Sequence, residues 1–283
     1  MEKLKDIWLD FFNEERNTDD WWTRKKTLWR KMKGEIVRIQ GDAKIYRKIC
    51  YENEIEYAYL LHVSYFIKQG DHFHREEQVT PYQFRLRDGE VIDHKEKLPS
   101  KPPITKQLSI TPDEIQERST HMRFSYDRLA AVQYAERWWN SYNPNYRKFD
   151  VDCTNYVSQC VRAGGAPMRG IPNREQGWWY QDDNWSFSWA VAHSLRWYLS
   201  GSEEGLQGKE VENAEALRPG DIICYDFEGD GRFDHNTIVV AKDSYGMPLV
   251  NAHTDNSRNR NWSYEDSTAW TPDIQYKFFQ IGE

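Results

Sequence analysis

Residues 149–160 read Phe-Asp-Val-Asp-Cys-Thr-Asn-Tyr-Val-Ser-Gln-Cys, and they decide how the second half of the chain is interpreted. Asp152 is a residue type that caps helices, so a helix is predicted to start at Cys153 and to end at Gly164. The first turn of a helix offers free N–H groups and a partial positive charge, which favour a thiolate and can hold an oxyanion. Cys153 is therefore predicted to be a nucleophile, with a buried structural cysteine as the alternative reading.

Downstream of this helix, His235 is a candidate base. It precedes the apolar run at residues 238–240, so it is expected where a strand leaves the core and can reach a neighbouring helix N-terminus. There it would take the thiol proton and later give one to the leaving amine. A surface histidine at a strand end is the alternative.

The next predicted strand reads Leu-Val-Asn-Ala-His-Thr and contains Asn251 and His253. These two side chains share one face by alternation, so either could accept a hydrogen bond from His235 and orient its ring. Asn251 is preferred because it lies further inside the strand, and His253 is the alternative. Asp234 and Asp255 are weaker candidates for the same role.

The N-terminal third is predicted to be a separate α+β domain, residues 1–98. Apolar residues recur at helical spacing through residues 1–33, and residues 17–20 are expected to end one helix and cap the next. Turns are predicted at Gly41-Asp42, at Gly70 and at Asp88-Gly89. The predicted strands cover residues 36–39, 43–50, 55–67, 72–84 and 90–94. Helices followed by a curled antiparallel sheet make a cystatin-like arrangement.

Several prolines among lysine and serine mark residues 99–120 as a linker, and residues 121–283 are predicted to form the second domain. The elements expected in this domain, besides the helix that starts at Cys153, are a helix at 125–141 capped by Ser125, a loop and helix at 178–197, and strands at 221–227, 235–242, 248–253 and 275–281.

Composition narrows the function class. The chain of 283 residues carries a net charge of −7, which argues against a nucleic-acid partner. Mean hydropathy is −0.91 and no run of eighteen apolar residues occurs, so no membrane partner is expected. No signal peptide is visible, which predicts a cytoplasmic protein or one that reaches a released or spore compartment.

No cofactor and no metal site are predicted. The four cysteines form no C-x-x-C pair and are expected to be free thiols. Residues 226–234 resemble the start of a calcium loop, but Thr237 stands where such a loop needs a bidentate glutamate. A turn between two strands is the preferred interpretation.

The blocks at 152–159, 220–221, 229–235 and 250–254 together resemble the putative amidase domain family, over roughly residues 125–283. This family is a bacterial branch of the papain-like cysteine peptidases that cut cell-wall peptides. The resemblance implies a papain-like α+β domain in which the cysteine helix packs on an antiparallel sheet. It also implies Cys153 as nucleophile, His235 as base and the Asn251 region as the third member, where related wall peptidases often carry histidine.

Two further residues are candidates for the substrate site. In related enzymes a residue upstream of the cysteine assists the oxyanion hole, which implies Tyr146 here. Trp189 lies in the tryptophan-rich stretch between nucleophile and base, where an aromatic ring could line a groove or pack in the core.

The predicted function is cysteine-dependent amide hydrolysis through an acyl-cysteine intermediate, with peptidoglycan peptides or related peptides as substrate. Two alternatives stay open: a catalytically inactive wall- or peptide-binding module, and a thiol acyltransferase of the same fold. Loss of Cys153 or His235 would have favoured the inactive module, and both residues are present.

Overall fold

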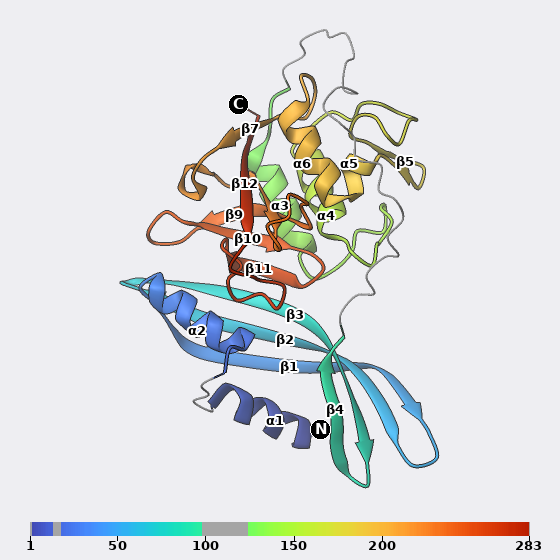
Figure 1. Ribbon diagram of the computed structural model, residues 1–283, viewed down its shortest axis with the longest axis vertical. Coiled ribbons are helices and arrows are strands. Elements are labelled where there is room, and N and C mark those ends of the chain that lie inside the picture. Colours follow the sequence, from blue (N-terminus) through green and yellow to red (C-terminus); the bar gives the residue numbers. More distant parts are fainter. Residues whose placement is uncertain (1, 14–17, 98–123, 283) are drawn as a thin grey trace. The chain divides into compact units, whose positions relative to one another are not determined.

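The computed structural model describes residues 2–13, 18–97 and 124–282, and the chain divides into two compact units (Figure 1). Unit 1 comprises residues 1–98 and 264–269, and unit 2 comprises residues 99–263 and 270–283. The predicted linker at 99–120 lies outside the described residues. Both units combine helices with antiparallel strands, so the chain is an α+β protein, as predicted.

Unit 1 begins with two helices, α1 (Glu2–Asn13) and α2 (Trp21–Lys31). The carboxylate of Asp20 accepts a hydrogen bond from the N–H of Thr23 at 2.8 Å, which satisfies one of the free donors at the start of α2. The predicted helix break and cap are therefore confirmed at Asp20.

The sheet of unit 1 is an antiparallel meander. Its strands are β1 (Gly34–Cys50), β2 (Ile55–Gln69), β3 (His72–Arg87) and β4 (Glu90–Glu96). The turns at Gly70 and at Asp88-Gly89 are confirmed, but the turn predicted at Gly41-Asp42 is wrong, because both residues pair with β2 inside a continuous β1. Two register shifts elsewhere in β1 show that the strand accommodates irregularity by bulging and not by turning.

A buried cation marks the core of unit 1. Lys25 of α2 is fully buried, and its ammonium contacts the carboxylate of Glu76 and, at 2.6 Å, that of Asp266. Glu76 also accepts a hydrogen bond from the indole of Trp29 at 3.1 Å. Because a buried charge is tolerated only when it is paired, this cluster fixes α2 to β3 and to the 264–269 segment.

Unit 2 carries the other elements. Its helices are α3 (Arg128–Trp138), α4 (Cys153–Ala163), α5 (Phe187–Ala190), α6 (Ala192–Gly201) and the short 3-10 helix η2 (Ala214–Ala216). Its strands are β5 (Tyr180–Gln181), β6 (Asn184–Trp185), β7 (Gly208–Val211), β8 (Ile222–Asp226), β9 (His235–Lys242), β10 (Pro248–Ala252), β11 (Asn256–Asn261) and β12 (Gln275–Ile281). Apart from the β5–β6 pair, the strands form a sheet in the order β11-β10-β9-β8-β12-β7.

The predicted boundaries of α4, β9 and β12 are confirmed, whereas α3 starts later and ends earlier than the predicted 125–141. Its cap is Asp127 and not Ser125, since the Asp127 carboxylate accepts from the N–H of Ala130 at 2.9 Å. The strands β5, β6, β7 and β11 were not predicted. In β11 the sequence Asn-Ser-Arg-Asn-Arg-Asn shows no apolar alternation from which a strand could be inferred.

The helices α3, α4 and α6 pack against one face of this sheet (Figure 1). The core between helices and sheet contains Tyr156 and Val157 of α4, Cys224 of β8, and Ile238 and Val240 of β9. Even-numbered residues of β9 thus face the helices, and odd-numbered residues face the opposite side. None of the helices in the described ranges is long and apolar enough to cross a bilayer.

Candidate active site

Cys153 is the first residue of α4, and its side chain is only 1% exposed. The thiol lies 3.8 Å from the hydroxyl of Thr154 and 4.0 Å from the carbonyl oxygen of Asp234. Burial raises the pKa of the Cys153 thiol, although the N–H of Asn236 and the Thr154 hydroxyl act in the opposite direction. Desolvation is the largest effect, and the resting group is a thiol that donates to the Asp234 carbonyl.

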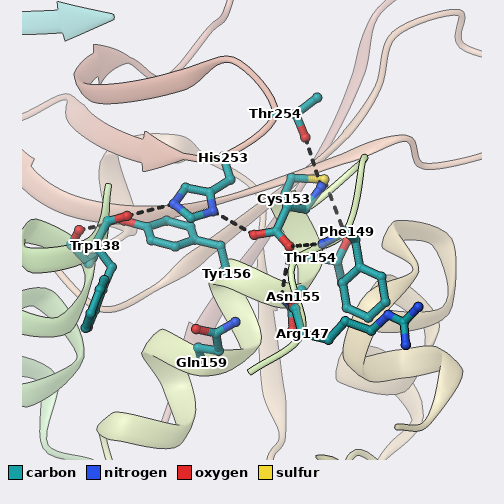
Figure 2. A network of polar contacts seen from close by, with 12 residues as sticks. Trp138, Arg147, Phe149, Cys153, Thr154, Asn155, Tyr156, Gln159, His253 and Thr254 are labelled. Atoms are coloured by element: carbon teal, nitrogen blue, oxygen red, sulfur yellow. Dashed lines mark hydrogen bonds and ion pairs between the residues drawn. The ribbon is translucent and has the colours of Figure 1, made fainter. Parts of the chain in front are cut away.

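Asp152 was predicted to cap α4, but its side chain makes no capping bond. One carboxylate oxygen accepts from the N–H of Phe149 and from the side-chain amide of Asn155, both at 2.9 Å. The other lies 2.7 Å from Nδ1 of His253 (Figure 2). Asp152 thus ties the loop before the nucleophile to the strand end 101 residues away.

His253 is 2% exposed and is fixed on three sides. Besides the Asp152 contact, its Nε2 lies 2.7 Å from the carbonyl oxygen of Trp138, and its ring stacks on Tyr156 with a centroid distance of 4.0 Å (Figure 2). His253 therefore links the loop before the nucleophile to the last residue of α3.

Asn251 lies inside β10, and both ends of its amide are used. Its Nδ2 donates to the Glu136 carboxylate at 2.9 Å, and its Oδ1 accepts from the N–H of Asn259 at 2.9 Å. Glu136 in turn accepts from Arg258 at 2.7 Å. In this arrangement Asn251 connects β10 with α3 and β11.

His235 is the first residue of β9 and pairs across the sheet with Tyr225. Its ring packs against those of Tyr225 and Phe227, at centroid distances of 5.6 Å and 6.1 Å. The next residue, Asn236, faces α4, so alternation directs the imidazole of His235 to the other side of the sheet. In the described part of the chain, the hydrogen-bond partners of the Cys153 thiol are Thr154, Asp234, Asn236 and Thr254, and no ring nitrogen is among them.

Burial, reinforced by the charge of Arg260, lowers the pKa of His235 from 6.5 to about 3. Between these two values the unfolded chain binds a proton at His235 and the folded chain does not. Stability is therefore lost as the pH falls below 6.5. Between pH 7 and pH 5 this residue should cost about 2 kcal/mol of unfolding free energy. Urea unfolding of the wild type and of His235→Gln at both pH values checks this, and an equal loss in both proteins would contradict it.

Two residues next to the nucleophile were not predicted from the sequence. Asn236 donates from Nδ2 to the Thr154 hydroxyl at 2.9 Å. Thr254 accepts from the N–H of Asp152 at 3.3 Å and has a φ of 88°, which is an outlier for a β-branched residue. Alternation from Ile238 would have placed Asn236 on the helix side, but no sequence signal marks Thr254.

The aromatic candidates divide between the core and the surface. Trp189 is fully buried behind α4, where its indole donates to Asn155 at 2.8 Å, so it supports the helix and lines no groove. Tyr146 is half-buried and stacks on Trp189. Trp185 is half-buried as well, and the guanidinium groups of Arg147 and Arg174 lie 5.4 Å and 4.8 Å from its ring. Trp185 is therefore an accessible aromatic side chain close to the loop that leads to Cys153.

The residues best suited to a metal among those described are Asp226, Glu228 and Asp234, whose ligand atoms lie within 4.8 Å of one another. The Asp226 carboxylate accepts from the N–H groups of Gly229 and Gly231 at 2.8 Å and 2.7 Å, as in a turn. Burial and the neighbouring Glu228 raise the pKa of Asp234 to about 7. The cluster therefore carries less negative charge near neutral pH than three separate carboxylates would.

Comparison with known proteins identifies the family of this chain. Residues 125–279 match the family model described as a putative amidase domain. The uncharacterized protein YhbB of Bacillus subtilis (strain 168) is 48% identical over 264 residues, which cover 91% of this chain and 85% of that protein. The uncharacterized protein YjcM of the same strain is 26% identical over 220 residues, covering 74% of this chain and 47% of that protein. No solved structure matches. The chain belongs to the putative amidase domain family.

Proposed function

We propose that this protein is a cysteine-dependent amide hydrolase in which Cys153 attacks the substrate carbonyl. The observation that carries the proposal is the position of Cys153, at the first turn of α4 inside the matched domain, with the Asn236 N–H and the Asp234 carbonyl at its thiol. The N–H groups of this turn have no acceptor within the helix and are suited to an oxyanion. A cysteine helix packed on an antiparallel sheet is also what a papain-like domain requires.

In the first step the sulfur–carbon bond forms, the carbon–nitrogen bond breaks, and the thiol proton passes through a base to the leaving amine. Water then attacks the acyl-cysteine, releasing a carboxylic acid and restoring the thiol. His235 is our candidate for the base because the resemblance to the putative amidase domain family implies this role. In this role His235 requires a less buried setting than the resting one, in which burial lowers its pKa to about 3. It follows Asp234, whose carbonyl contacts the thiol, so a backbone rotation between these two residues would bring the imidazole to the nucleophile. We assign this rotation to substrate binding, which must also expose Cys153.

The third role is assigned to His253 acting through Asp152, in place of Asn251. Both ends of the Asn251 amide are already occupied by Glu136 and Asn259. Asp152, in contrast, directly precedes the nucleophile and is held by His253 at 2.7 Å. His253 would thus position the loop that carries Cys153, and would not orient the base.

Peptides of the peptidoglycan type are the proposed substrate class. The support is the resemblance to wall amidases, together with Trp185 and its flanking Arg147 and Arg174, which offer an aromatic face and cationic groups to a peptide. Tyr146, stacked behind this surface on Trp189, is assigned to the substrate side of the nucleophile loop.

The test is trapping of the covalent intermediate. Purified peptidoglycan stem peptides are mixed with the protein, quenched in acid within milliseconds to seconds, and the protein is mapped by mass spectrometry. We expect an acyl adduct on Cys153 and none on Cys160, a buried cysteine two turns along the same helix, together with new amino and carboxyl ends in the peptides. Cleavage without an adduct on Cys153, or no cleavage of any stem peptide, would contradict the proposal.

A further inference from the structure

The amide of Asn236 is buried next to the nucleophile with one end open. The residue is completely buried, and its Nδ2 donates to the Thr154 hydroxyl at 2.9 Å. Its Oδ1 is also buried and has no hydrogen-bond partner among the described residues. Buried polar atoms in native proteins are nearly always paired, so an open acceptor at this place calls for an explanation.

Asn236 is connected to the nucleophile through both its backbone and its side chain. Its backbone N–H points to the Cys153 thiol, where it lowers the pKa against the effect of burial. Its side chain is held by Thr154, whose hydroxyl lies 3.8 Å from the Cys153 sulfur. The open oxygen therefore belongs to the immediate surroundings of the atom that would attack the substrate.

We propose that Oδ1 of Asn236 accepts a hydrogen bond from the N–H of the scissile amide, and that this contact makes the site selective for secondary amides over esters. The inference rests on the proposed hydrolase function and names its substrate class more closely. A secondary amide brings the N–H donor that the resting site lacks. An ester of the same shape brings an oxygen, which would place lone pairs against lone pairs.

The size of the expected selectivity follows from the chemistry of such sites. A pocket that is built to hydrogen-bond a substrate N–H strongly disfavours the analogue that lacks it, because the buried acceptor then stays unpaired. An apolar residue in place of Asn236 removes both the hydrogen bond to the amide N–H and the penalty of an unpaired acceptor facing the ester. The change therefore lowers the rate on the amide relative to the rate on the ester.

The experiment compares one stem peptide, cleaved at a mapped bond, with its depsipeptide, in which oxygen replaces the scissile N–H. The measured quantity is the ratio of kcat/KM for the peptide to kcat/KM for the depsipeptide. For Asn236→Leu we expect this ratio to fall by about 10- to 100-fold relative to the wild type. Asn236→Asp keeps an acceptor for the amide N–H, so its ratio should not fall below the wild-type value.

Asn261→Leu is the matched control. Asn261 is also buried and also has an open amide end, at Nδ2, but its oxygen accepts from the N–H of Ser263 and it lies in β11. Its ratio should equal that of the wild type. Urea unfolding confirms that each variant is folded before its rates are compared.

An equal loss on both substrates in Asn236→Leu would overturn the inference while leaving the hydrolase proposal intact. It would mean that Asn236 acts only through the packing of Thr154, or that its amide donates to the substrate carbonyl. Failure of the wild type to cleave either substrate would instead reject the hydrolase function itself, so the two failures are distinguishable.

Discussion

Replacing Cys153 with alanine is expected to lower kcat for amide hydrolysis by at least about 10⁴-fold, because no other group can form the acyl intermediate. The side chain lies in a buried position and changes little in volume, so the fold should persist. Rates on a stem peptide, measured together with the urea unfolding midpoint, check both parts of this expectation.

Cys160→Ala provides the control for this experiment, since Cys160 is equally buried in the same helix but points into the core formed by α3, α4 and the sheet. It should lose stability and keep its turnover. Normal turnover in Cys153→Ala would remove Cys153 from the mechanism, and the proposed acyl-cysteine chemistry with it.

Replacing His253 with leucine is expected to destabilise the protein by about 3–5 kcal/mol at pH 7. The reason is that the Asp152 carboxylate would stay buried, at 2% exposure, without its partner at Nδ1 of His253. The Trp138 carbonyl would lose its donor in the same step. Urea unfolding measures the effect, and a loss below about 1 kcal/mol would contradict this expectation.

The double variant His253→Leu, Asp152→Asn separates charge from packing. An asparagine at 152 can still accept from the N–H of Phe149 but carries no charge, so part of the lost stability should return. If the double variant is no more stable than His253→Leu alone, the stacking of His253 on Tyr156 is the larger contribution.

Local signals in the sequence were sufficient for the elements that carry the site. The helix at Cys153 ends where glycine allows it to end, and β9 follows from an unbroken apolar run after His235. The same kind of signal was misleading at Gly41, because a glycine and an aspartate can also lie within a long strand when both neighbours pair.

The side-chain partners could not be predicted in the same way. Asp152 is a residue type that often caps helices. Its carboxylate instead contacts His253, which lies 101 residues later in the sequence. His235 and Asn236 are adjacent in sequence, and only the direction of the strand decides which of them faces α4. A shift of one residue in which side chains face α4 leaves the secondary structure unchanged but changes which side chain lies next to the nucleophile.

The buried lysine of unit 1 has a consequence for how the chain is made. Lys25 needs two carboxylates, and one of them, Asp266, lies in a short segment near the other end of the chain. On the ribosome, the N-terminal unit therefore emerges long before its last ionic partner is synthesised. Residues 1–98 can collapse early, but their unit acquires its complete core only after residues 264–269 have been synthesised.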